Sequence, residues 1–387
     1  MTAPIDLKIR RCIYLDARNK LFVDTFRVAR AWERPGRNQF WEVQMKKFLM
    51  ASAVAAAAVV SAGSALAEGL TIGVSWSNFQ EERWKTDEAA MKAAIEANGD
   101  TYISADAQLS SAKQLSDVES LIAQGADALV VLSVDSGSVG AVVDLADAEG
   151  IPVLGYDRLI EDSRAFYLTF DNKEVGRVIA RSIQEVVPTG NYAIIKGDAG
   201  DPNALFLLEG MMDVIGDAVD AGDIVIAGES FTDGWKPDNA QRNMEQILTA
   251  NDNNIDAVLS ENDGMAGGAI AALQAQGLDI PVSGQDGDHA ALNRVARGSQ
   301  LVSVWKDARQ LGAAAGNIAA ALAAGTAPAD IEGAVAWSGG ANGVEMSAIF
   351  LAPTPISAEN LDVVIDAGHI TKEKVCEGAM DSVAACQ

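Results

Sequence analysis

Part of this 387-residue sequence occurs twice. The run Asp127-Ala-Leu-Val-Val-Leu-Ser is echoed by Asp256-Ala-Val-Leu-Ser, and Ile151-Pro-Val-Leu-Gly-Tyr-Asp157 is echoed by Ile280-Pro-Val-Ser-Gly-Gln-Asp286. The spacing from Asp127 to Asp157 equals the spacing from Asp256 to Asp286, 30 positions in each case. Two motifs rarely keep an equal spacing by chance, so we expect two structurally similar halves.

Strand and helix patterns alternate along both halves. Residues 128–132 are apolar throughout, which is typical of a strand that is buried on both faces of a parallel sheet. Helical periodicity follows such strands, and the alternation predicts an α/β protein with two doubly wound parallel-sheet lobes and right-handed crossovers. The expected strands are 71–76, 102–104, 128–132, 152–156, 193–195, 224–226, 257–259, 281–283 and 301–305, and expected helices include 82–98, 110–125, 173–187 and 310–324.

The repeat ends in an aspartate in each half, Asp157 and Asp286. In open α/β sheets, ligands lie beyond the carboxyl ends of the strands. A ligand that both aspartates hold must therefore lie between the two lobes.

The side chains at the strand ends suit a polyhydroxylated ligand. Asp, Asn, Gln and Arg groups can each bond two adjacent hydroxyls of a sugar, and the rings of Trp84 and Trp235 can stack on its apolar face. Each residue also has a structural explanation: Trp84 as core, Trp235 as part of a turn, Asp157 with Arg158 as a surface ion pair, and the other Asp and Asn residues as helix caps. The segments concerned are Tyr156-Asp-Arg158, Phe170-Asp-Asn172, Asp201-Pro-Asn203, Glu261-Asn-Asp263, Gln285-Asp286 and Trp305-Lys306.

The first 67 residues are set apart from the fold. Met45-Lys-Lys, the apolar run 48–60 and the ending Ala65-Leu-Ala67 form a secretory signal peptide over residues 45–67, with cleavage expected after Ala67 and the periplasm as destination. Residues 1–44 are interpreted as an upstream extension of the gene. A DNA-binding head on a sugar-sensing regulator is the alternative, but the stretch shows no helix-turn-helix pattern, and an export signal contradicts it.

Composition narrows the class of function. Lys and Arg number 29 against 54 Asp and Glu, a net charge of -25, so binding to nucleic acid or to an anionic membrane surface is not expected. Two His and three Cys leave almost no ligands for a zinc or iron site, and we expect neither a metal nor a cofactor. No nucleophile elbow or phosphate loop is present, so no catalytic residue is assigned and the chain is expected not to be an enzyme. Glycoside hydrolysis by Asp157 and Asp286 remains the enzymatic alternative.

Cys376 and Cys386 lie close together near the C-terminus. In an oxidising compartment we expect them to form a disulfide that closes a short loop. Two free thiols on a frayed tail are the alternative.

Several motifs carry a resemblance to a known family: Glu82-Arg-Trp84, Tyr156-Asp-Arg158, Phe170-Asp-Asn172, Gly190-Asn-Tyr192, Asp233-Gly-Trp235, Ala250-Asn251 with 253–258, 267–270 and Ser283-Gly-Gln-Asp286. With them, nearly all of residues 70–365 resembles the periplasmic sugar-binding proteins of ABC importers, in the ribose and galactose cluster, and most closely those that bind D-xylose. Two places depart from the family pattern: Pro202 stands where relatives have Asn, and the segment 337–345 is rich in Gly.

The resemblance implies a type I periplasmic binding protein fold with three hinge crossovers, near residues 171, 286 and 345. The N-terminal lobe would then comprise 68–171 with 287–345, and the C-terminal lobe 172–286 with 346–387. It also implies that these residues grip the sugar: Arg83, Trp84, Asp157, Arg158, Asn203, Trp235, Asn262, Asp286 and Lys306.

The role that the resemblance implies is capture of a monosaccharide, with D-xylose favoured, by closure of the two lobes. Glucose, galactose, arabinose, ribose and a quorum signal are the alternative ligands. The expected partners are an ABC permease in the inner membrane and a separate ATPase, with the protein itself a monomer. Whether a chemoreceptor also recognises the closed form is left open.

Overall fold

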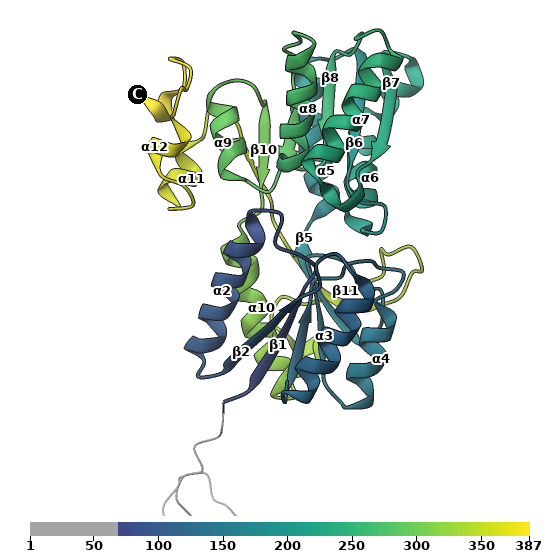
Figure 1. The fold of residues 1–387 in the computed structure, drawn as a ribbon, viewed down its shortest axis with the longest axis vertical. Coiled ribbons are helices and arrows are strands. Elements are labelled where there is room, and N and C mark those ends of the chain that lie inside the picture. Colours follow the sequence, from purple (N-terminus) through teal and green to yellow (C-terminus); the bar gives the residue numbers. More distant parts are fainter. Residues whose placement is uncertain (1–68) are drawn as a thin grey trace, which may run out of the picture. The chain divides into compact units, whose positions relative to one another are not determined.

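Residues 69–387 are described by a computed structural model, and they belong to a single unit that begins at Ala67. The expected upstream extension and signal peptide lie outside the described residues. Two lobes make up the described part, and they are seen one above the other in Figure 1. Between residues 69 and 387, no helix combines the length and the apolar character needed to cross a membrane.

The N-terminal lobe is built on a seven-stranded sheet. Neighbouring strands are parallel except at one edge, where the last two strands pair antiparallel. Alternate residues of the interior strand β3 (Ala128–Val131) pack into two different cores, Ala128 and Val130 on one face and Leu129 and Val131 on the other, as its apolar sequence predicts. The spatial order is β11 (Val335–Trp337), β12 (Met346–Leu351), β5 (Ala165–Phe170), β4 (Val153–Tyr156), β3 (Ala128–Val131), β1 (Thr71–Trp76) and β2 (Thr101–Asp106).

Helices cover both faces of this sheet (Figure 1). One face carries α2 (Arg83–Ala97) and α10 (Ala308–Ala323), and the other carries α3 (Ser111–Ala123) and α4 (Gly140–Ala148). A short 3-10 turn, η2 (Pro328–Asp330), leads from α10 toward the edge strands. The two layers of helices give the doubly wound arrangement that the alternating sequence predicts.

The sheet of the C-terminal lobe consists of two three-stranded ladders, linked by a single parallel bridge between Val258 and Val282. Its strands are parallel except for the last, which pairs antiparallel with its neighbour. The spatial order is β7 (Ile224–Phe231), β6 (Gly190–Lys196), β8 (Ala257–Ser260), β9 (Ser283–Gln285), β10 (Val302–Trp305) and β13 (Thr354–Ile356).

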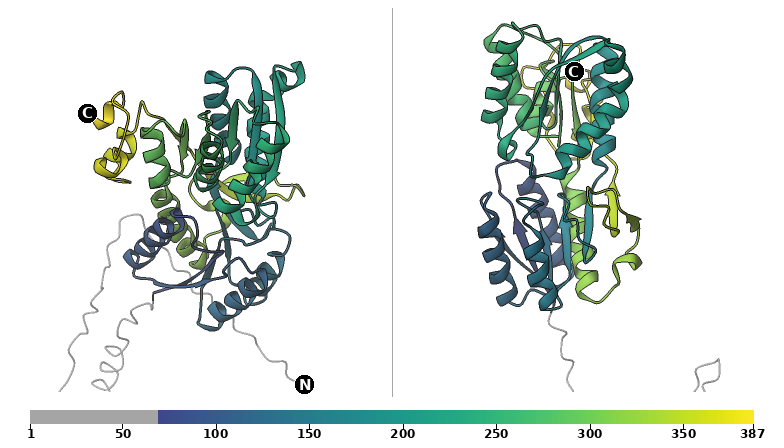
Figure 2. Two further views of the ribbon diagram at one scale, coloured as in Figure 1. Left: turned by 45° about the horizontal axis from the view of Figure 1, so that its top comes forward. Right: turned by 90° about the vertical axis from the view of Figure 1, so that its right-hand side faces the viewer.

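Two pairs of helices flank this second sheet (Figure 2). One pair is α5 (Asn172–Val186) with α6 (Pro202–Ala221), and the other is α7 (Pro237–Ala250) with α8 (Asp263–Ala275). The 3-10 turn η1 (Asp233–Trp235) precedes α7, and α9 (His289–Ala296) connects β9 to β10. The spatial order of the strands therefore repeats that of the N-terminal lobe, and α9 is an additional helix with no counterpart between β4 and β5.

The C-terminal segment adds a small layer to this lobe. It contains α11 (Asp362–Asp366), α12 (Lys372–Val375) and η3 (Ala384–Cys386), which pack through Leu361 and Val364 on Leu292 and Trp305. Cys376 and Cys386, the expected pair, are joined by a disulfide.

The chain crosses between the lobes three times, after β5, after β10 and after β12. The first crossover is at Asp171, as expected, but the boundaries expected at 286 and 345 are wrong. Residues 287–305 stay in the C-terminal lobe because β10 pairs with β9, and β12 stays in the N-terminal lobe because it pairs with β5. The lobes are therefore 69–171 with 308–351, and 172–305 with 354–387.

Both helices that follow a crossover pack very closely on a neighbouring helix of their own lobe, α5 on α6 and α10 on α2. On α5 and α6, a Cβ at Gly176 would lie 2.1 Å from the carbonyl oxygen of Leu207, and one at Gly210 would lie 2.0 Å from that of Lys173. On α10, a Cβ at Gly312 would lie 2.4 Å from the carbonyl oxygen of Asp87 on α2. Only glycine permits this approach of two helix backbones.

The segment 337–345, which departs from the family pattern, lies beside the first crossover. Trp337 contacts Phe206 of α6 in the other lobe, with ring centroids 6.1 Å apart. Glu161 holds the loop that follows, because its Oε1 accepts hydrogen bonds from the backbone N–H groups of Asn342 (2.8 Å) and Val344 (3.3 Å). This segment therefore adds an aromatic contact between the lobes.

Candidate functional site

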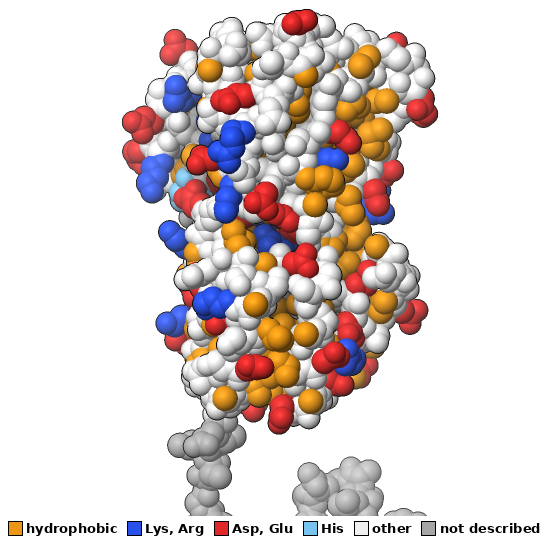
Figure 3. Space-filling model, turned by 45° about the vertical axis from the view of Figure 1, so that its right-hand side comes forward, with side chains coloured by type: hydrophobic (Ala, Val, Ile, Leu, Met, Phe, Trp, Pro, Cys, Tyr) orange, Lys and Arg blue, Asp and Glu red, His pale blue; other side chains and the backbone are white. Residues whose placement is uncertain are grey.

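A cavity lies between the lobes, where the carboxyl ends of both sets of strands meet. The space between its lining residues is about 290 Å³, part of which is open to solvent. In the space-filling view, basic side chains lie recessed in a hollow at this seam, with acidic side chains at its rim (Figure 3). The structure brings together at this cavity all nine residues that the sequence analysis assigns to the site: Arg83, Trp84, Asp157, Arg158, Asn203, Trp235, Asn262, Asp286 and Lys306.

Arg83, on the first turn of α2, joins the carboxylates of both lobes. Its Nη2 lies 3.0 Å from Asp157 Oδ2, and its Nη1 lies 3.1 Å from Asp286 Oδ1. The Nε contacts Asp87 Oδ2, one turn along the same helix, at 3.3 Å. All four side chains are at most 7% exposed. A buried guanidinium thus lies between three carboxylates and reduces the repulsion among them.

Lys306, in the second crossover, supplies a second cation. Its Nζ lies 3.4 Å from Asp286 Oδ1 and 3.7 Å from Asp157 Oδ2. Burial acts to raise the pKa of Asp157, but the charges of Arg83 and Lys306 outweigh it and hold that pKa below its usual value. Burial raises the pKa of Asp87 to about 6, against the opposing effect of Arg83. Asp157 is therefore ionised at neutral pH and can accept hydrogen bonds from hydroxyl groups.

The two repeat aspartates share an unusual backbone conformation. Asp157 has φ 59° and Asp286 has φ 100°, in the left-handed region that non-glycine residues rarely adopt. Each backbone N–H donates to the carbonyl oxygen of the next strand, Asp157 to Leu168 (2.8 Å) and Asp286 to Val304 (2.9 Å). The internal repeat therefore extends to strained turns that aim both carboxylates into the cavity.

Asp263, at the start of α8, holds the Asp286 turn. Its Oδ2 accepts from the backbone N–H groups of Gly287 and Asp288, both at 3.0 Å, and from Ser303 Oγ at 2.6 Å. Burial raises the pKa of Asp263 to about 7, although the hydrogen bond from Ser303 acts to lower it. A buried carboxylate thus fixes the backbone on either side of a site residue.

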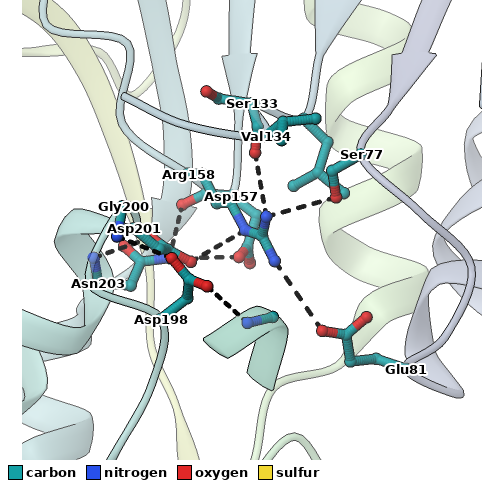
Figure 4. Close-up of polar contacts among 12 residues, drawn as sticks. Ser77, Glu81, Ser133, Val134, Asp157, Arg158, Asp198, Gly200, Asp201 and Asn203 are labelled. Carbon is teal, nitrogen blue, oxygen red and sulfur yellow. Dashed lines mark hydrogen bonds and ion pairs between the residues drawn. The ribbon is translucent and has the colours of Figure 1, made fainter. Parts of the chain in front are cut away.

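Arg158 is fixed by groups from both lobes (Figure 4). Its Nε lies 2.9 Å from Asp201 Oδ2, and its Nη1 donates to the carbonyl oxygen of Ser133 at 3.0 Å. Its Nη2 lies 3.9 Å from Glu81 Oε1. Burial raises the pKa of Asp201, and Arg158 acts in the opposite direction. Asp157 and Arg158 are therefore both buried, which excludes the alternative that they form a surface ion pair.

Asn203 joins the lobes by hydrogen bonds. Its Nδ2 donates to Asp157, at 3.2 Å to the backbone oxygen and 3.4 Å to Oδ1, and its Oδ1 accepts from Asn172 Nδ2 at 2.9 Å. Pro202 occupies the first turn of α6, directly after the N-cap Asp201, where a missing N–H leaves no helical hydrogen bond unmade. The departure from the family sequence is therefore accommodated without loss of this contact.

Asn262 is both a helix cap and a cavity-lining residue, the two roles that the sequence allowed. Its Oδ1 caps α8 by accepting from the N–H of Met265 at 2.8 Å. The residue also lines the cavity, and within residues 69–387 its Nδ2 makes no side-chain hydrogen bond. The capped oxygen fixes the side chain, and the amide N–H₂ is left as a donor.

The two tryptophans are buried and differ in their hydrogen bonding. The Nε1 of Trp84 donates to Glu81 Oε2 at 2.7 Å, and the Arg83 guanidinium lies 4.4 Å from the Trp84 ring centroid. Trp235 packs against Gly197, where a Cβ would lie 2.1 Å from its ring, and its buried Nε1 has no partner among the described residues. Trp235 therefore offers both a ring and a free donor.

Three further residues line the cavity and were not assigned to it from sequence: Glu81, Asp201 and Gln285. Each is adjacent to or near an assigned residue, so proximity to a strand end or helix start was the available signal. Gln285 is the last residue of β9, and its buried Oε1 has no partner between residues 69 and 387. The cavity thus presents free acceptors as well as a free donor.

A comparison with protein families matches residues 72–327 to the family described as "Periplasmic binding protein domain". The chain is 40% identical over 268 residues to the D-xylose-binding periplasmic protein of Escherichia coli (strain K12), covering 68% of this chain and 81% of that protein. It is 36% identical to the D-xylose-binding periplasmic protein of Haemophilus influenzae, covering 82% of this chain and 96% of that one.

Solved structures agree on the fold. An ABC transporter solute binding protein from Clostridium phytofermentans with bound beta-D-glucose has a TM-score of 0.72 and 30% identity, and the match covers 79% of this chain and 99% of that one. A carbohydrate transporter solute binding protein from Chloroflexus aurantiacus in complex with D-glucose has a TM-score of 0.71 and 27% identity, and its match covers 79% and 98%. The two-lobed α/β architecture is therefore shared with sugar-bound proteins.

Proposed function

The chain belongs to the periplasmic binding protein domain family, and from this premise we propose that it captures a monosaccharide, D-xylose in the first place, between its lobes and delivers it to an ABC permease. A separate ATPase would supply the energy, and the protein would act as a monomer. The sugar would bind one lobe first and gain the contacts of the second on closure, so that bound sugar favours the closed form.

One observation carries this proposal. The repeat aspartates, Asp157 of one lobe and Asp286 of the other, face the same cavity and share the cations Arg83 and Lys306 within 3.7 Å. Sugar hydroxyls both donate and accept, so they can bond the carboxylates and the cations at once. A ligand held in this way is in contact with both lobes.

Buried groups of this kind favour one stereoisomer. An epimer that leaves a buried carboxylate or amide unpaired loses about 1–3 kcal/mol for each such group. Trp84 and Trp235 lie on the cavity wall and would limit the room for the hydroxymethyl group of a hexose.

The lowered pKa of Asp157 argues against glycoside hydrolysis by the pair Asp157 and Asp286. A glycosidase of the usual kind needs a general acid whose pKa is raised. Asp157 instead has a lowered pKa, because Arg83 and Lys306 oppose the effect of burial, and Asp286 is bonded to the same cations. Incubation with xylosides should therefore release no sugar.

The decisive experiment is calorimetry with D-xylose, D-glucose, D-galactose, L-arabinose and D-ribose. We expect D-xylose to bind tightest and to raise the thermal unfolding temperature most. Tighter binding of another sugar of the panel would replace the ligand and leave the capture mechanism in place. Failure of every sugar to bind would contradict the proposal.

We also propose that the protein works in the periplasm after cleavage behind Ala67, and that residues 1–44 are an upstream extension absent from the exported form. The periplasmic names of the relatives support this location. Mass spectrometry of the N-terminus of the exported protein tests it, with Glu68 expected as the first residue. A mature N-terminus ahead of Met45 would contradict it.

A further inference from the structure

Both histidines of the chain lie together at the edge of the cleft, outside the cavity. His289 is the first residue of α9, three positions after Asp286, and His369 follows α11. Their rings are 5.1 Å apart between centroids. His369 Nε2 lies 2.7 Å from the carbonyl oxygen of Gly287, so it donates to the residue directly after Asp286. The pair therefore belongs to the structure around one site carboxylate.

Glu82 of the other lobe reaches this pair. Its Oε1 lies 3.1 Å from His289 Nδ1, and its Oε2 accepts from the backbone N–H of His289 at 3.2 Å. Glu82 is the N-cap residue of α2 and directly precedes Arg83. One carboxylate thus connects the start of the helix that carries Arg83 to the segment that carries Asp286.

The hydrogen-bond geometry of His289 requires both ring nitrogens to be donors. The second nitrogen, Nε2, lies 2.9 Å from the carbonyl oxygen of His369, which can only accept. The Glu82 carboxylate at Nδ1 can also only accept. A neutral imidazole has one N–H, and its lone pair would face one of these oxygens. The protonated ring satisfies both contacts.

The surrounding charges agree with this geometry. The hydrogen bond that His289 donates to Glu82 raises the pKa of His289, although burial acts to lower it, and the same bond lowers the pKa of Glu82. Burial lowers the pKa of His369, which fits a neutral ring that donates through Nε2. Other charged groups facing the three residues are Lys374 of α12, Asp288 beside His289, and Asp307 with Arg309 at the start of α10.

We propose that Glu82 and His289 form a proton-dependent latch between the lobes, which positions Arg83 against Asp286 and strengthens sugar binding as the pH falls. The proposal rests on the proposed function, because it concerns the closed, sugar-binding form. When the lobes separate, His289 loses Glu82 and its pKa returns toward the ordinary value of about 6.5. Closure therefore takes up a proton near this pH, and by linkage a bound proton favours closure.

The sign follows from the raised pKa of His289 when it contacts Glu82. The latch is complete below the ordinary pKa of histidine and is lost as the pH rises through the raised value. Glu82 stays ionised throughout this range because its own pKa is lowered. The two side chains are 34% and 48% exposed, so the effect is that of a solvent-screened pair, about two- to fivefold in affinity.

The first test is calorimetry with D-xylose at pH 5.5 and pH 8.5. We expect the unmodified protein to bind D-xylose about two- to fivefold more tightly at pH 5.5 than at pH 8.5. In Glu82→Gln and in His289→Gln, the part of this difference that comes from the pair should be absent. His289→Lys, which keeps a cation at both pH values, should bind tightly at both. A pH effect of the same size in Glu82→Gln and His289→Gln would overturn the proposal. Asp288→Asn serves as control, because it removes a neighbouring acid and should keep the His289 effect.

The second test needs no sugar. A chain with two histidines gives a simple imidazole NMR spectrum, and His369→Gln assigns the signals. We expect the pKa of His289 to be higher in the unmodified protein than in Glu82→Gln, and higher still with D-xylose. An equal pKa in both proteins would overturn the latch. If D-xylose fails to bind while Glu82 still raises the pKa of His289, the latch stands and the proposed ligand fails.

Discussion

The turns after β4 and β9 have similar backbones in different electrostatic surroundings. Both contain an aspartate at positive φ whose N–H bonds the next strand. Asp157 faces the cations Arg83 and Lys306 and is followed by a third, Arg158. Asp286 shares the first two cations but lies near the acids Asp263 and Asp288. The two halves of the repeat share the geometry of this turn and differ in the charges around it.

The positions just before the two aspartates diverged as well. Tyr156 donates its hydroxyl to Asp87, so it supports the charge cluster from within the N-terminal lobe. Its counterpart Gln285 lines the cavity with an unpartnered oxygen. One half of the repeat thus supplies the buried framework of cations, and the other supplies groups that are free to bond a ligand.

The largest expected effect comes from removing the cation that both turns share. Arg83→Met should lower the free energy of unfolding by about 3–5 kcal/mol, because Asp87, Asp157 and Asp286 lose their common partner, and it should weaken D-xylose binding at least 100-fold. Urea unfolding and calorimetry measure the two effects. Lys92→Met on the exposed side of the same helix is the control, with a change within about 0.5 kcal/mol. Equal stability of both variants would contradict the role of Arg83.

Neutralising the two aspartates one at a time tests whether their electrostatic surroundings differ. Asp157→Asn should lower the free energy of unfolding without sugar by about 1–3 kcal/mol, since Arg83 and Lys306 lose a counter-charge. Asp286→Asn should cost less, because it also relieves repulsion with Asp263 and Asp288. Both variants should bind D-xylose at least tenfold more weakly. Equal losses of stability would mean that the two turns are electrostatically alike.

Asp263, which accepts hydrogen bonds from the turn at Asp286, should make the stability of the protein depend on pH. Asp263 has a pKa of about 7 in the folded protein because of burial, against about 3.9 in an unfolded chain. The folded state therefore binds more protons between these values, and this carboxyl lowers stability as the pH rises from about 4 to about 7. Thermal unfolding across that range should show a smaller decline in Asp263→Asn. An identical decline in the variant would assign the effect to other groups.

The smallest effect on sugar binding is expected at the C-terminal layer, the segment that contains α11, α12 and η3. Replacing both Cys376 and Cys386 by Ser should destabilise that layer by about 2–3 kcal/mol, because a short loop is no longer closed. D-xylose affinity should change less than threefold, since the disulfide does not line the cavity. Limited proteolysis measures the first effect and calorimetry the second. A large loss of affinity would show that the layer acts on the site.

Sequence patterns predicted the main strands and helices because those elements are strongly apolar or periodic. The helix expected over 82–98 is observed at Arg83–Ala97, and the strand expected over 71–76 is observed with the same bounds. β5 was not among the expected strands, although residues 165–170 are entirely buried. The second crossover was misplaced for a related reason. One further strand of the same sheet follows each repeat aspartate, β5 after Asp157 and β10 after Asp286, and the boundary expected at 286 left β10 out of the C-terminal lobe.

The sequence predicted which side chains would come together at the cavity, but it did not predict the contacts among them. Strand-end residues and family motifs identified nine side chains that the structure places at one cavity. The roles of Asp87, Glu81 and Asp201 depend on the rotation of α2 and on which groups of the second lobe meet Arg83 and Arg158. Such contacts follow from packing between distant segments and leave no local pattern in the sequence.

The glycine contacts between α5 and α6, and between α10 and α2, have a mechanical consequence. The backbones of α5 and α10, the helices that follow a crossover, are in close contact with the backbones of α6 and α2. Neither helix can therefore shift within its lobe when the lobes rotate. The bending must then be concentrated in the few peptide units at Asp171, at 306–307 and at 352–353. A single methyl group at Gly210 would push α5 away from α6 and so tilt the axis about which the lobes rotate. The angle between the lobes without sugar would then change, although Gly210 does not line the cavity.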